Sequence, residues 1–199
     1  MKPSGIITLT TDFGRTDPYA GAVKGVILSI NRDAVLVDIS HDIPRGSVAE
    51  ASWALMECYG FFPPGTVHLA VVDPGVGGER RAVAAASGGH FFVGPDNGVF
   101  WPSIRRPGSV TVHLNNPRYF LPVVSSTFHG RDIFAPVAAR LSRGEDINSI
   151  GDIIVDPVKL EMPEPFISSG KLHGRIIRSD HFGNLISNLG RKAVTGFLE

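Results

Sequence analysis

The sequence predicts an α/β fold in which a mostly parallel sheet carries helices on its faces. Three short apolar runs, at residues 6–10, 34–39 and 65–72, have the composition of buried strands. Two stretches with helical periodicity, residues 17–30 and 47–59, separate them. Because strand–helix–strand connections join parallel neighbours, this order predicts a parallel sheet covered by helices.

The two predicted helices begin with recognisable start signals. Asp17 is expected to cap the first helix, with Pro18 as its first helical residue, where a missing backbone N–H is tolerated. Ser47 and Glu50 have the spacing of a capping box at the start of the second helix. Both helices are therefore expected to start close to these residues.

Beyond the third apolar run the strands become shorter, and glycine-rich turns separate them. Residues 81–86, 90–93 and 109–114 are predicted strands of this kind. Residues 132–141 are predicted to form a helix, with Pro136 near its first turn, where proline is tolerated. We assign these elements to the same domain as the parallel strands.

Prolines mark the expected boundary between two domains. Residues 152–165 carry several of them and are predicted to form a linker or a strap across the surface. We therefore expect an N-terminal α/β catalytic domain over residues 1–165 and a small C-terminal β domain over residues 166–199. Residues 174–178 and 184–187 are predicted strands of the second domain, which is expected to be truncated because the chain ends early.

Charge and composition exclude several classes of function. Basic and acidic residues both number 19, so the formal net charge is zero and no basic excess indicates nucleic acid or a membrane surface. The sequence has neither a membrane-spanning apolar stretch nor a signal-peptide pattern. The single cysteine, Cys58, cannot form an intramolecular disulfide, which favours a reducing, cytoplasmic setting. A small charged ligand is compatible with all of these observations.

Acidic residues follow the predicted parallel strands, where a ligand site is expected. In an open α/β sheet, ligands bind beyond the carboxyl ends of the strands. Asp12 and Asp73 lie there, and each leads into a glycine that lets a ligand approach the backbone. For these two residues a functional role is favoured over simple solvation of a strand end. Asp38 lies within the last turn of its strand, so a structural hydrogen bond is the better interpretation.

An arginine and a histidine are candidates to join Asp73. The glycine-rich turn after Asp73 can return Arg80 to it, where a guanidinium favours the ionised carboxylate, although a structural ion pair has the same pattern. His129 precedes a predicted helix, whose positive N-terminus lowers the pKa of an imidazole and leaves it able to accept a proton. Gly130 permits close approach there. The alternative is a capping loop with Asp132 as N-cap, and both interpretations can hold together.

A metal site is the competing interpretation of the same polar residues. Asp12, Asp73, Asp96 and His129 carry hard donor atoms, but the sequence has no HxH, HExxH or paired-cysteine spacing. We therefore expect no metal. The glycine-rich turn after Asp73 is also not a phosphate-binding loop, because it lacks the Gly-Lys-Ser/Thr ending.

A further loop and the remaining histidines have simpler explanations. Residues 180–184 lie between two predicted strands, where a hairpin turn explains the Gly-Asn pair, and a binding role requires that this loop face a cleft. For His41 a structural role is at least as well supported as a functional one. Structural roles are favoured for His68, His90, His113 and His173.

Five motifs occur in an order that resembles a known enzyme family. They are TDFG at residues 11–14, DPGVG at 73–77 followed by Arg80 and Arg81, GPDNG at 94–98, FHGRD at 128–132 and DHFGN at 180–184. Together they resemble the S-adenosyl-L-methionine hydroxide adenosyltransferases, relatives of the fluorinase and chlorinase enzymes. Each motif alone is a weak signal, but five in register are specific.

The resemblance implies an architecture and a reaction. It implies a large N-terminal α/β domain, a small C-terminal β-barrel domain and a homotrimer whose active sites lie between subunits. It implies that an activated water attacks the ribose C5′ of S-adenosyl-L-methionine, producing adenosine and L-methionine without a cofactor. The family's barrel continues beyond the length of this chain, so we expect only its beginning here.

The resemblance also implies roles for individual residues. The water-activating set of the family corresponds to Asp73, Arg80 and His129. The carboxylate that holds the ribose hydroxyls corresponds to Asp12, and the acidic group near the methionine amine corresponds to Asp17. Further expected substrate contacts are Asn97, Gly130 and, from a neighbouring subunit, Asp180, Phe182 and Asn184.

The resemblance favours water over halide as the nucleophile. The halogenating relatives have Tyr-Pro-x-Thr-Gly where this chain has residues 73–77, and a tyrosine where it has His129. A carboxylate beside the line of attack repels halide, whereas with a histidine it can accept a proton from water. A halide-using 5′-halo-adenosine synthase and a non-catalytic S-adenosylmethionine- or adenosine-binding protein are the alternatives. Gly46 stands where many relatives have a larger side chain near the adenosine, which implies a more open contact.

Overall fold

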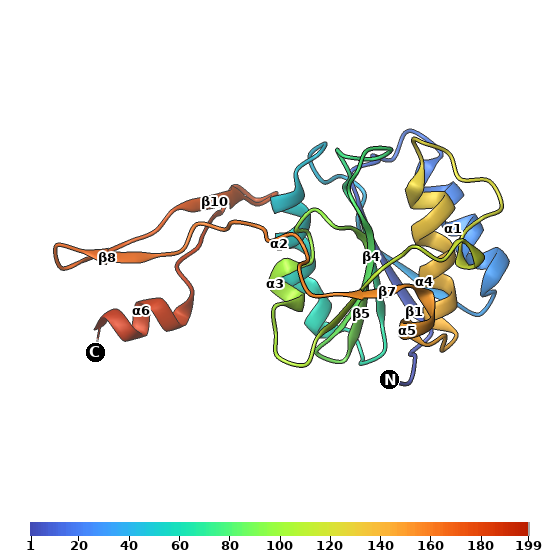
Figure 1. Cartoon of the computed structure of the whole chain (residues 1–199). Coiled ribbons are helices and arrows are strands. Elements are labelled where there is room, and N and C mark those ends of the chain that lie inside the picture. Colours follow the sequence, from blue (N-terminus) through green and yellow to red (C-terminus); the bar gives the residue numbers. More distant parts are fainter. Residues whose placement is uncertain (199) are drawn as a thin grey trace. The chain divides into compact units, whose positions relative to one another are not determined.

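The computed structural model describes residues 1–198, which divide into two units. The first unit spans Met1–Leu160, and the second begins at Glu161 (Figure 1). The expected domain boundary after residue 165 lies close to this division.

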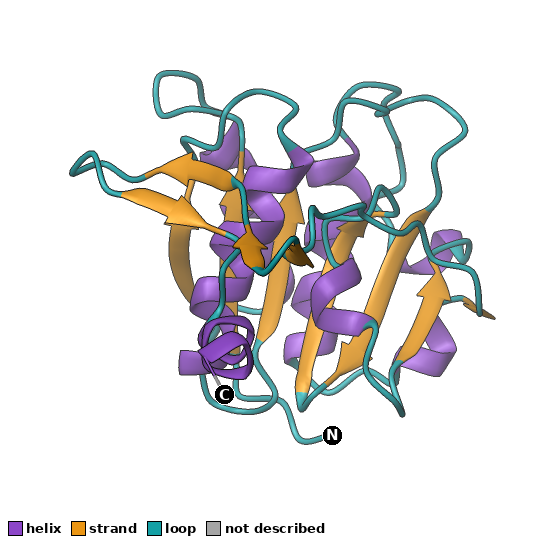
Figure 2. Ribbon diagram, turned by 90° about the vertical axis from the view of Figure 1, so that its left-hand side faces the viewer, coloured by secondary structure: helices purple, strands orange, loops and turns teal. Residues whose placement is uncertain are grey.

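A seven-stranded mixed sheet forms the first unit, with the strand order β2-β1-β3-β5-β4-β6-β7 (Figure 2). The first four strands pair in parallel, and the others pair antiparallel. The α/β class is therefore confirmed, with parallel pairing in one half of the sheet. The strands are β1 (Ile6–Thr11), β2 (Val35–Ser40), β3 (Val67–Val71), β4 (Ala82–Ser87), β5 (His90–Pro95), β6 (Val110–His113) and β7 (Asp152–Ile154).

Helices cover both faces of this sheet, as predicted (Figure 1). The α-helices are α1 (Tyr19–Ile30), α2 (Val48–Cys58), α3 (Trp101–Ile104), α4 (Ala135–Ser142) and α5 (Ile147–Ile150). Shorter helical turns are η1 (Tyr59–Phe61), η2 (Pro117–Tyr119) and the π-helical η3 (Gly130–Phe134). Within residues 1–198, none of the helices is long and apolar enough to cross a membrane.

Two hydrophobic cores form because the central strands are buried on both faces. In β3, Leu69 packs into a core with α1 and α4, whereas the next residue, Ala70, packs into a core with α2 and α3. Successive side chains of a strand point to opposite faces, so a continuous apolar run supplies both cores. This arrangement fixes the carboxyl ends of β1 and β3 side by side, since these two strands are paired neighbours.

The starts of α1 and α2 differ in detail from the predicted ones. The N-cap position of α1 is Pro18, not Asp17, and no side chain caps it. Ser47 does occupy the N-cap of α2, but its side chain makes no capping hydrogen bond. The N–H of Val48 instead bonds the carbonyl of Gly46, so the chain turns within this segment and the capping box does not form.

The helix predicted at residues 132–141 begins earlier, as the π-helical turn η3. His129 is its N-cap, so Asp132 lies inside the helix and the prediction that it caps the helix is wrong. Pro136 accounts for the irregular start, because proline has no N–H to donate to the carbonyl of Asp132. That carbonyl accepts the N–H of Leu121 at 2.9 Å instead.

Residues 152–165 form the predicted linker only in part. Their first residues make β7, which pairs antiparallel with β6 at the edge of the sheet. The first proline of the stretch is Pro157, so the preceding backbone keeps the N–H groups that strand pairing needs.

The second unit contains two separate two-stranded sheets. The predicted strands at residues 174–178 and 184–187 correspond to β10 (Ile176–Ser179) and β11 (Leu185–Ser187), which pair antiparallel. A hairpin of β8 (Phe166–Ser168) and β9 (Lys171–His173) and the helix α6 (Arg191–Leu198) were not predicted. The start of a barrel therefore stays a prediction.

A buried histidine pair predicts acid sensitivity of the first unit. Burial, followed by the charge of His90, lowers the pKa of His68 to about 3, while unfolded histidine titrates near ~6.5. The unfolded chain therefore binds protons that the folded chain excludes, and stability present above about pH 6.5 is lost as the pH falls. We expect the free energy of unfolding in urea to drop by about 2 kcal/mol from about pH 7 to about pH 5. The His68→Gln variant should show a smaller drop, and an equal drop would contradict this origin.

Candidate active site

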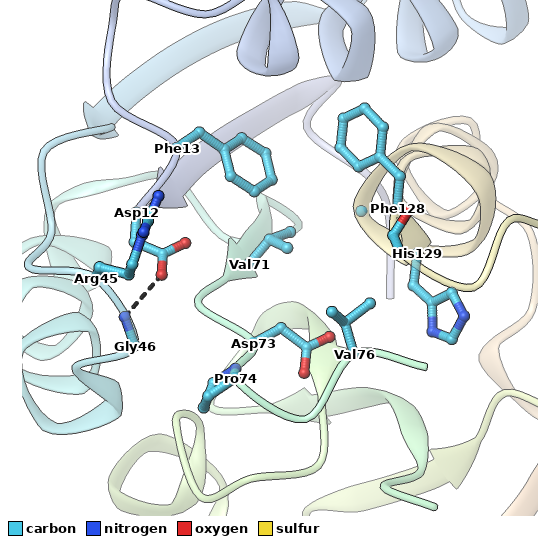
Figure 3. A pocket seen from close by; sticks show the side chains of 12 residues that line it. Asp12, Phe13, Arg45, Gly46, Val71, Asp73, Pro74, Val76, Phe128 and His129 are labelled. Carbon is cyan, nitrogen blue, oxygen red and sulfur yellow. Dashed lines mark hydrogen bonds between the residues drawn. The ribbon is translucent and has the colours of Figure 1, made fainter. Parts of the chain in front are cut away.

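A hollow at the carboxyl ends of β1 and β3 gathers side chains from four segments (Figure 3). It has a volume of about 290 Å³ and is lined by Asp12, Phe13, Arg45, Gly46, Val71, Asp73, Pro74, Val76, Thr127, Phe128, His129 and Gly130. An adjoining hollow of about 540 Å³ shares Asp12, Phe13, Arg45, Val76, Thr127 and Phe128, and adds Asp17, Tyr19, Ser125 and Arg131. Together they form one candidate site where ligands of open α/β sheets bind.

Arg80 joins Asp73 to His129 at the side of this hollow. Its Nε donates to Asp73 Oδ1 at 2.9 Å, and one terminal nitrogen donates to His129 Nδ1 at 2.7 Å. The Arg80 and Asp73 side chains are only 11% and 6% exposed, and the ring of Phe134 lies beneath the guanidinium at 5.4 Å. The structure thus brings the imidazole of His129 to the Asp73–Arg80 pair, whose arginine lies 49 residues earlier in the sequence.

The geometry defines the protonation state of His129. Because an arginine N–H donates to Nδ1, that nitrogen carries a lone pair and the ring proton resides on Nε2. Burial and then the charge of Arg80 lower the pKa of His129, while the charges of Asp73 and Asp132 raise it in part. The imidazole is therefore neutral at physiological pH. The pKa of His129 is lowered, as predicted, but the causes are burial and the Arg80 guanidinium and not the helix end.

Two glycines allow the turn after β3 to adopt this shape. A side chain at Gly75 would place its Cβ 3.1 Å from the Arg80 side chain, which folds back across the turn. Gly77 has a φ of +77°, and a Cβ there would lie 2.3 Å from the carbonyl oxygen of Ser126. Gly77 therefore lets the turn of Asp73 pack directly against the segment that leads to His129.

Asp12 lies across the hollow from His129 (Figure 3). Asp12 Oδ2 accepts the N–H of Gly46 at 2.8 Å, which directs one carboxylate oxygen (Figure 3). Gly46 has a φ of +70°, a conformation that favours glycine, so a backbone N–H and not a side chain faces Asp12. Asp17 lines the adjoining hollow next to Tyr19.

Gly130 forms part of the wall of the hollow, where the predicted close approach of a ligand to its backbone requires it to lie. A Cβ there would lie 3.2 Å from Val71 and 3.3 Å from the ring of Phe13. These separations are tighter than most real side-chain contacts. A substituted residue would push into the hollow or displace its wall.

Asn97, another predicted contact, does not line this hollow. The Asn97 side chain donates to the carbonyl of Val72 at 2.8 Å and accepts the N–H of Val99, so it stabilises the turn after β5. Asp180, Phe182 and Asn184 belong to the second unit. There Asp180 Oδ1 accepts the backbone N–H groups of Phe182 and Asn184, and the Phe182 ring is 86% exposed.

Asp96, the fourth residue considered for a metal site, makes structural contacts away from the hollow. Asp96 accepts from Arg81 Nε and from the N–H of Val158, both at 2.8 Å, which ties the chain after β7 to the sheet. Within residues 1–198, no group of three or more His, Cys, Asp or Glu side chains is arranged to hold a metal ion. Asp38 has the structural role that its position favours, since it contacts Lys24 at 2.6 Å.

Comparison with known families decides the assignment of this fold and site. A sequence model described as the SAM hydroxide adenosyltransferase N-terminal domain matches residues 7–151, which is most of the chain. The chain belongs to the SAM hydroxide adenosyltransferase family. The matched region includes all but the first residue of β1, together with β3 and the segment of His129, and therefore every residue that lines the hollow.

Individual members of this family are similar over most of their length. An (R)-S-adenosyl-L-methionine hydrolase of Thermus thermophilus is 40% identical over 207 aligned residues, covering 100% of this chain and 79% of that protein. One of Salinispora tropica is 38% identical, covering 93% of this chain and 72% of that protein. The crystal structure of an uncharacterized conserved protein from Thermotoga maritima superimposes with a TM-score of 0.91 at 36% identity, covering 97% and 74% of the two chains.

An aromatic wall of the site was not predicted from the sequence. The rings of Phe13, Tyr19 and Phe128 meet edge to face, with centroids 5.5–6.0 Å apart. Arg131 lies over Phe128 at 5.0 Å, and Arg45 lines both hollows. In the sequence, Phe13 and Phe128 each lie close to a motif glycine, Gly14 and Gly130. That proximity was the only sequence signal that these two rings belong to the site.

Proposed function

We propose that this chain hydrolyses (R)-S-adenosyl-L-methionine to adenosine and L-methionine. The main support for this proposal is that Arg80 bridges Asp73 and His129 at the edge of a hollow large enough for parts of a nucleoside. The relatives named (R)-S-adenosyl-L-methionine hydrolase support the substrate and the reaction. The assignment requires that this constellation hold a water molecule against the ribose C5′.

The proposed reaction is a displacement at carbon. The water oxygen attacks C5′, the C5′–S bond breaks, and its electron pair goes to sulfur, which leaves as neutral methionine. A sulfonium needs no acid to depart, so the enzyme contributes by placing the water and removing its proton. No metal or cofactor takes part in this scheme.

Asp73 is the proposed proton acceptor. His129 Nδ1 is already occupied by Arg80, and its Nε2 carries a proton, so the ring is suited to orient a water rather than to deprotonate it. A carboxylate oxygen has a second lone pair besides the one that faces Arg80. The water therefore gives its proton to Asp73 while His129 holds its position.

The remaining residues are proposed to hold the substrate. Asp12, with one oxygen directed by Gly46, is placed to accept the ribose hydroxyls. Asp17 in the adjoining hollow suits the positively charged amine of the methionine part. Gly130 allows the ribose to approach the wall of the hollow.

The family resemblance extends the proposal to assembly. We propose a homotrimer in which Asp180, Phe182 and Asn184 of a neighbouring subunit, and Asn97 indirectly, complete the site. Residues 166–199 would begin a small β-barrel domain that carries this loop. The Phe182 ring is exposed, so it is free to contact a substrate or a neighbouring subunit. The lone Cys58 supports a reducing, cytoplasmic setting.

Product analysis tests the proposed function against its alternatives. Incubation with (R)-S-adenosyl-L-methionine in water labelled with oxygen-18 should give adenosine that carries the label at its 5′ oxygen. A binding protein without catalysis would give no adenosine, and a halide-using enzyme would give a 5′-halo-adenosine when fluoride or chloride is added. Loss of product with a chelator would indicate a metal-dependent enzyme instead.

The state of His129 predicts how the activity depends on pH. Since burial and Arg80 lower the pKa of His129, kcat/KM should stay level through neutral pH and fall only below about pH 6.5, where a protonated ring can no longer accept from Arg80. The Arg80→Gln variant removes the repelling charge, so its acid limb should move to higher pH. A limb that stays in place in this variant would contradict the role of Arg80.

A further inference from the structure

One buried histidine, His41, holds the chain on both sides of Asp12. Its Nδ1 lies 2.8 Å from Thr11 Oγ1, and its carbonyl accepts the N–H of Gly14 at 2.8 Å. Asp12 and Phe13 therefore lie between two contacts made by the same residue. His41 is only 7% exposed and does not line the hollow itself, so it acts on the site through its neighbours.

The far side of the His41 ring faces a carboxylate. Its Nε2 lies 3.1 Å from Asp38 Oδ1, in an arrangement too bent for a regular hydrogen bond, so the attraction is mainly electrostatic. Lys24 of α1 holds the other oxygen of Asp38 at 2.6 Å. A proton on Nε2 is favoured beside a carboxylate, which leaves Nδ1 to accept from the Thr11 hydroxyl.

The segment that follows His41 completes the hold on Asp12. Ile43 donates its N–H to the carbonyl of Thr11, and Gly46 donates its N–H to Asp12 Oδ2 at 2.8 Å. One stretch of six residues thus contacts Asp12 itself and the residues on either side of it. Of these contacts only the Gly46 N–H holds the carboxylate directly, and the others fix the backbone that carries it.

We infer that His41 is a positioning residue that sets the direction of the Asp12 carboxylate for the ribose of the substrate. This inference rests on the proposed function, in which Asp12 accepts the ribose hydroxyls. His41 contributes no atom to the reaction. Its loss leaves Asp12 in the hollow with a wider range of orientations, so the ribose hydroxyls gain less from binding there.

The same strand offers a matched control for this contact. Three residues before Thr11, the buried Thr8 Oγ1 lies 2.8 Å from Nδ1 of another buried histidine, His68. Thr11→Val and Thr8→Val are both isosteric, and each removes one threonine–histidine bond from β1. Both variants lose stability for the same reason, but only Thr11→Val acts next to Asp12.

The experiment measures how well the enzyme recognises ribose hydroxyls in the absence of turnover. Dissociation constants for adenosine and for 2′,3′-dideoxyadenosine are determined by calorimetry for the wild type and each variant. We expect the wild type and Thr8→Val to bind adenosine more tightly than 2′,3′-dideoxyadenosine. In Thr11→Val and His41→Leu, the ratio of the two dissociation constants should fall by about tenfold. His41→Asn should keep most of the preference for adenosine, because its side-chain oxygen can accept from Thr11 in place of Nδ1.

Each outcome has a separate meaning. An unchanged preference in Thr11→Val and His41→Leu overturns the role of His41 while leaving the proposed function intact. An equal loss in Thr8→Val overturns it as well, since the effect would then follow from general destabilisation. A wild type with no preference for adenosine overturns the ribose contact of Asp12 in the proposed function, and the inference about His41 falls with it.

Discussion

We expect the Asp73→Asn substitution to lower kcat by about 10²–10⁴ while the affinity for S-adenosyl-L-methionine changes only a few-fold. Asparagine keeps the shape of the side chain and one oxygen that can face Arg80, so the turn after β3 can stay folded. It removes the group proposed to accept the proton of the attacking water. Single-turnover kinetics together with equilibrium binding separate the chemical step from substrate affinity.

A neighbouring ion pair supplies the control for this substitution. Asp96 and Arg81 form a pair one strand away whose carboxylate is about as buried as that of Asp73, and neither residue lines the hollow. Asp96→Asn should therefore reduce stability without a comparable loss of kcat. The assignment of Asp73 is wrong if its variant keeps kcat within about tenfold of the wild type, below the range expected of a proton acceptor.

A comparison of single and double variants separates the roles of Asp73 and His129. If His129 orients the water and Asp73 takes the proton, His129→Asn should cost less than Asp73→Asn. The double variant should be hardly slower than Asp73→Asn alone, because residues that act on one water are strongly non-additive.

The parts of the fold that were predictable are those that bury the most apolar surface. Every residue of β3 is buried, so its continuous apolar run is distinctive in the sequence. By contrast, the hairpin of β8 and β9 contains no buried residue, and neither does the helix α6. Strands of three residues are too short to show a periodic apolar pattern, which is why this hairpin was missed.

The site was predictable where local sequence sets the position of a side chain. Asp12 and Asp73 follow strands, and His129 precedes a helix, so the fold class alone brings them to one edge of the sheet. The partners of these side chains depend on tertiary contacts instead. Asp12, for example, accepts the N–H of Gly46, which lies 34 residues later in the chain. No spacing rule in the sequence identifies such a pair.

A methyl group at Gly77 should cost activity far more than stability. In Gly77→Ala the new Cβ would lie 2.3 Å from the carbonyl oxygen of Ser126, so the turn of Asp73 and Arg80 must move away from the segment of His129. The 2.7 Å contact between Arg80 and His129 joins these two segments and would lengthen. Since a displacement of about 1 Å can cost about 10²-fold in rate, we expect kcat to fall by at least about 10².

The backbone conformation of Gly77 must be separated from this collision, and Gly5 allows that. Both glycines have a φ of +77°, but a Cβ at Gly5 meets nothing within 4 Å. Alanine therefore costs about 1 kcal/mol of conformational strain at either position, and only at Gly77 does it also force two segments apart. Thermal unfolding and kcat measured on both variants distinguish the two effects. If Gly77→Ala were as active as Gly5→Ala, direct packing of the two segments would not be what holds the three groups around the water.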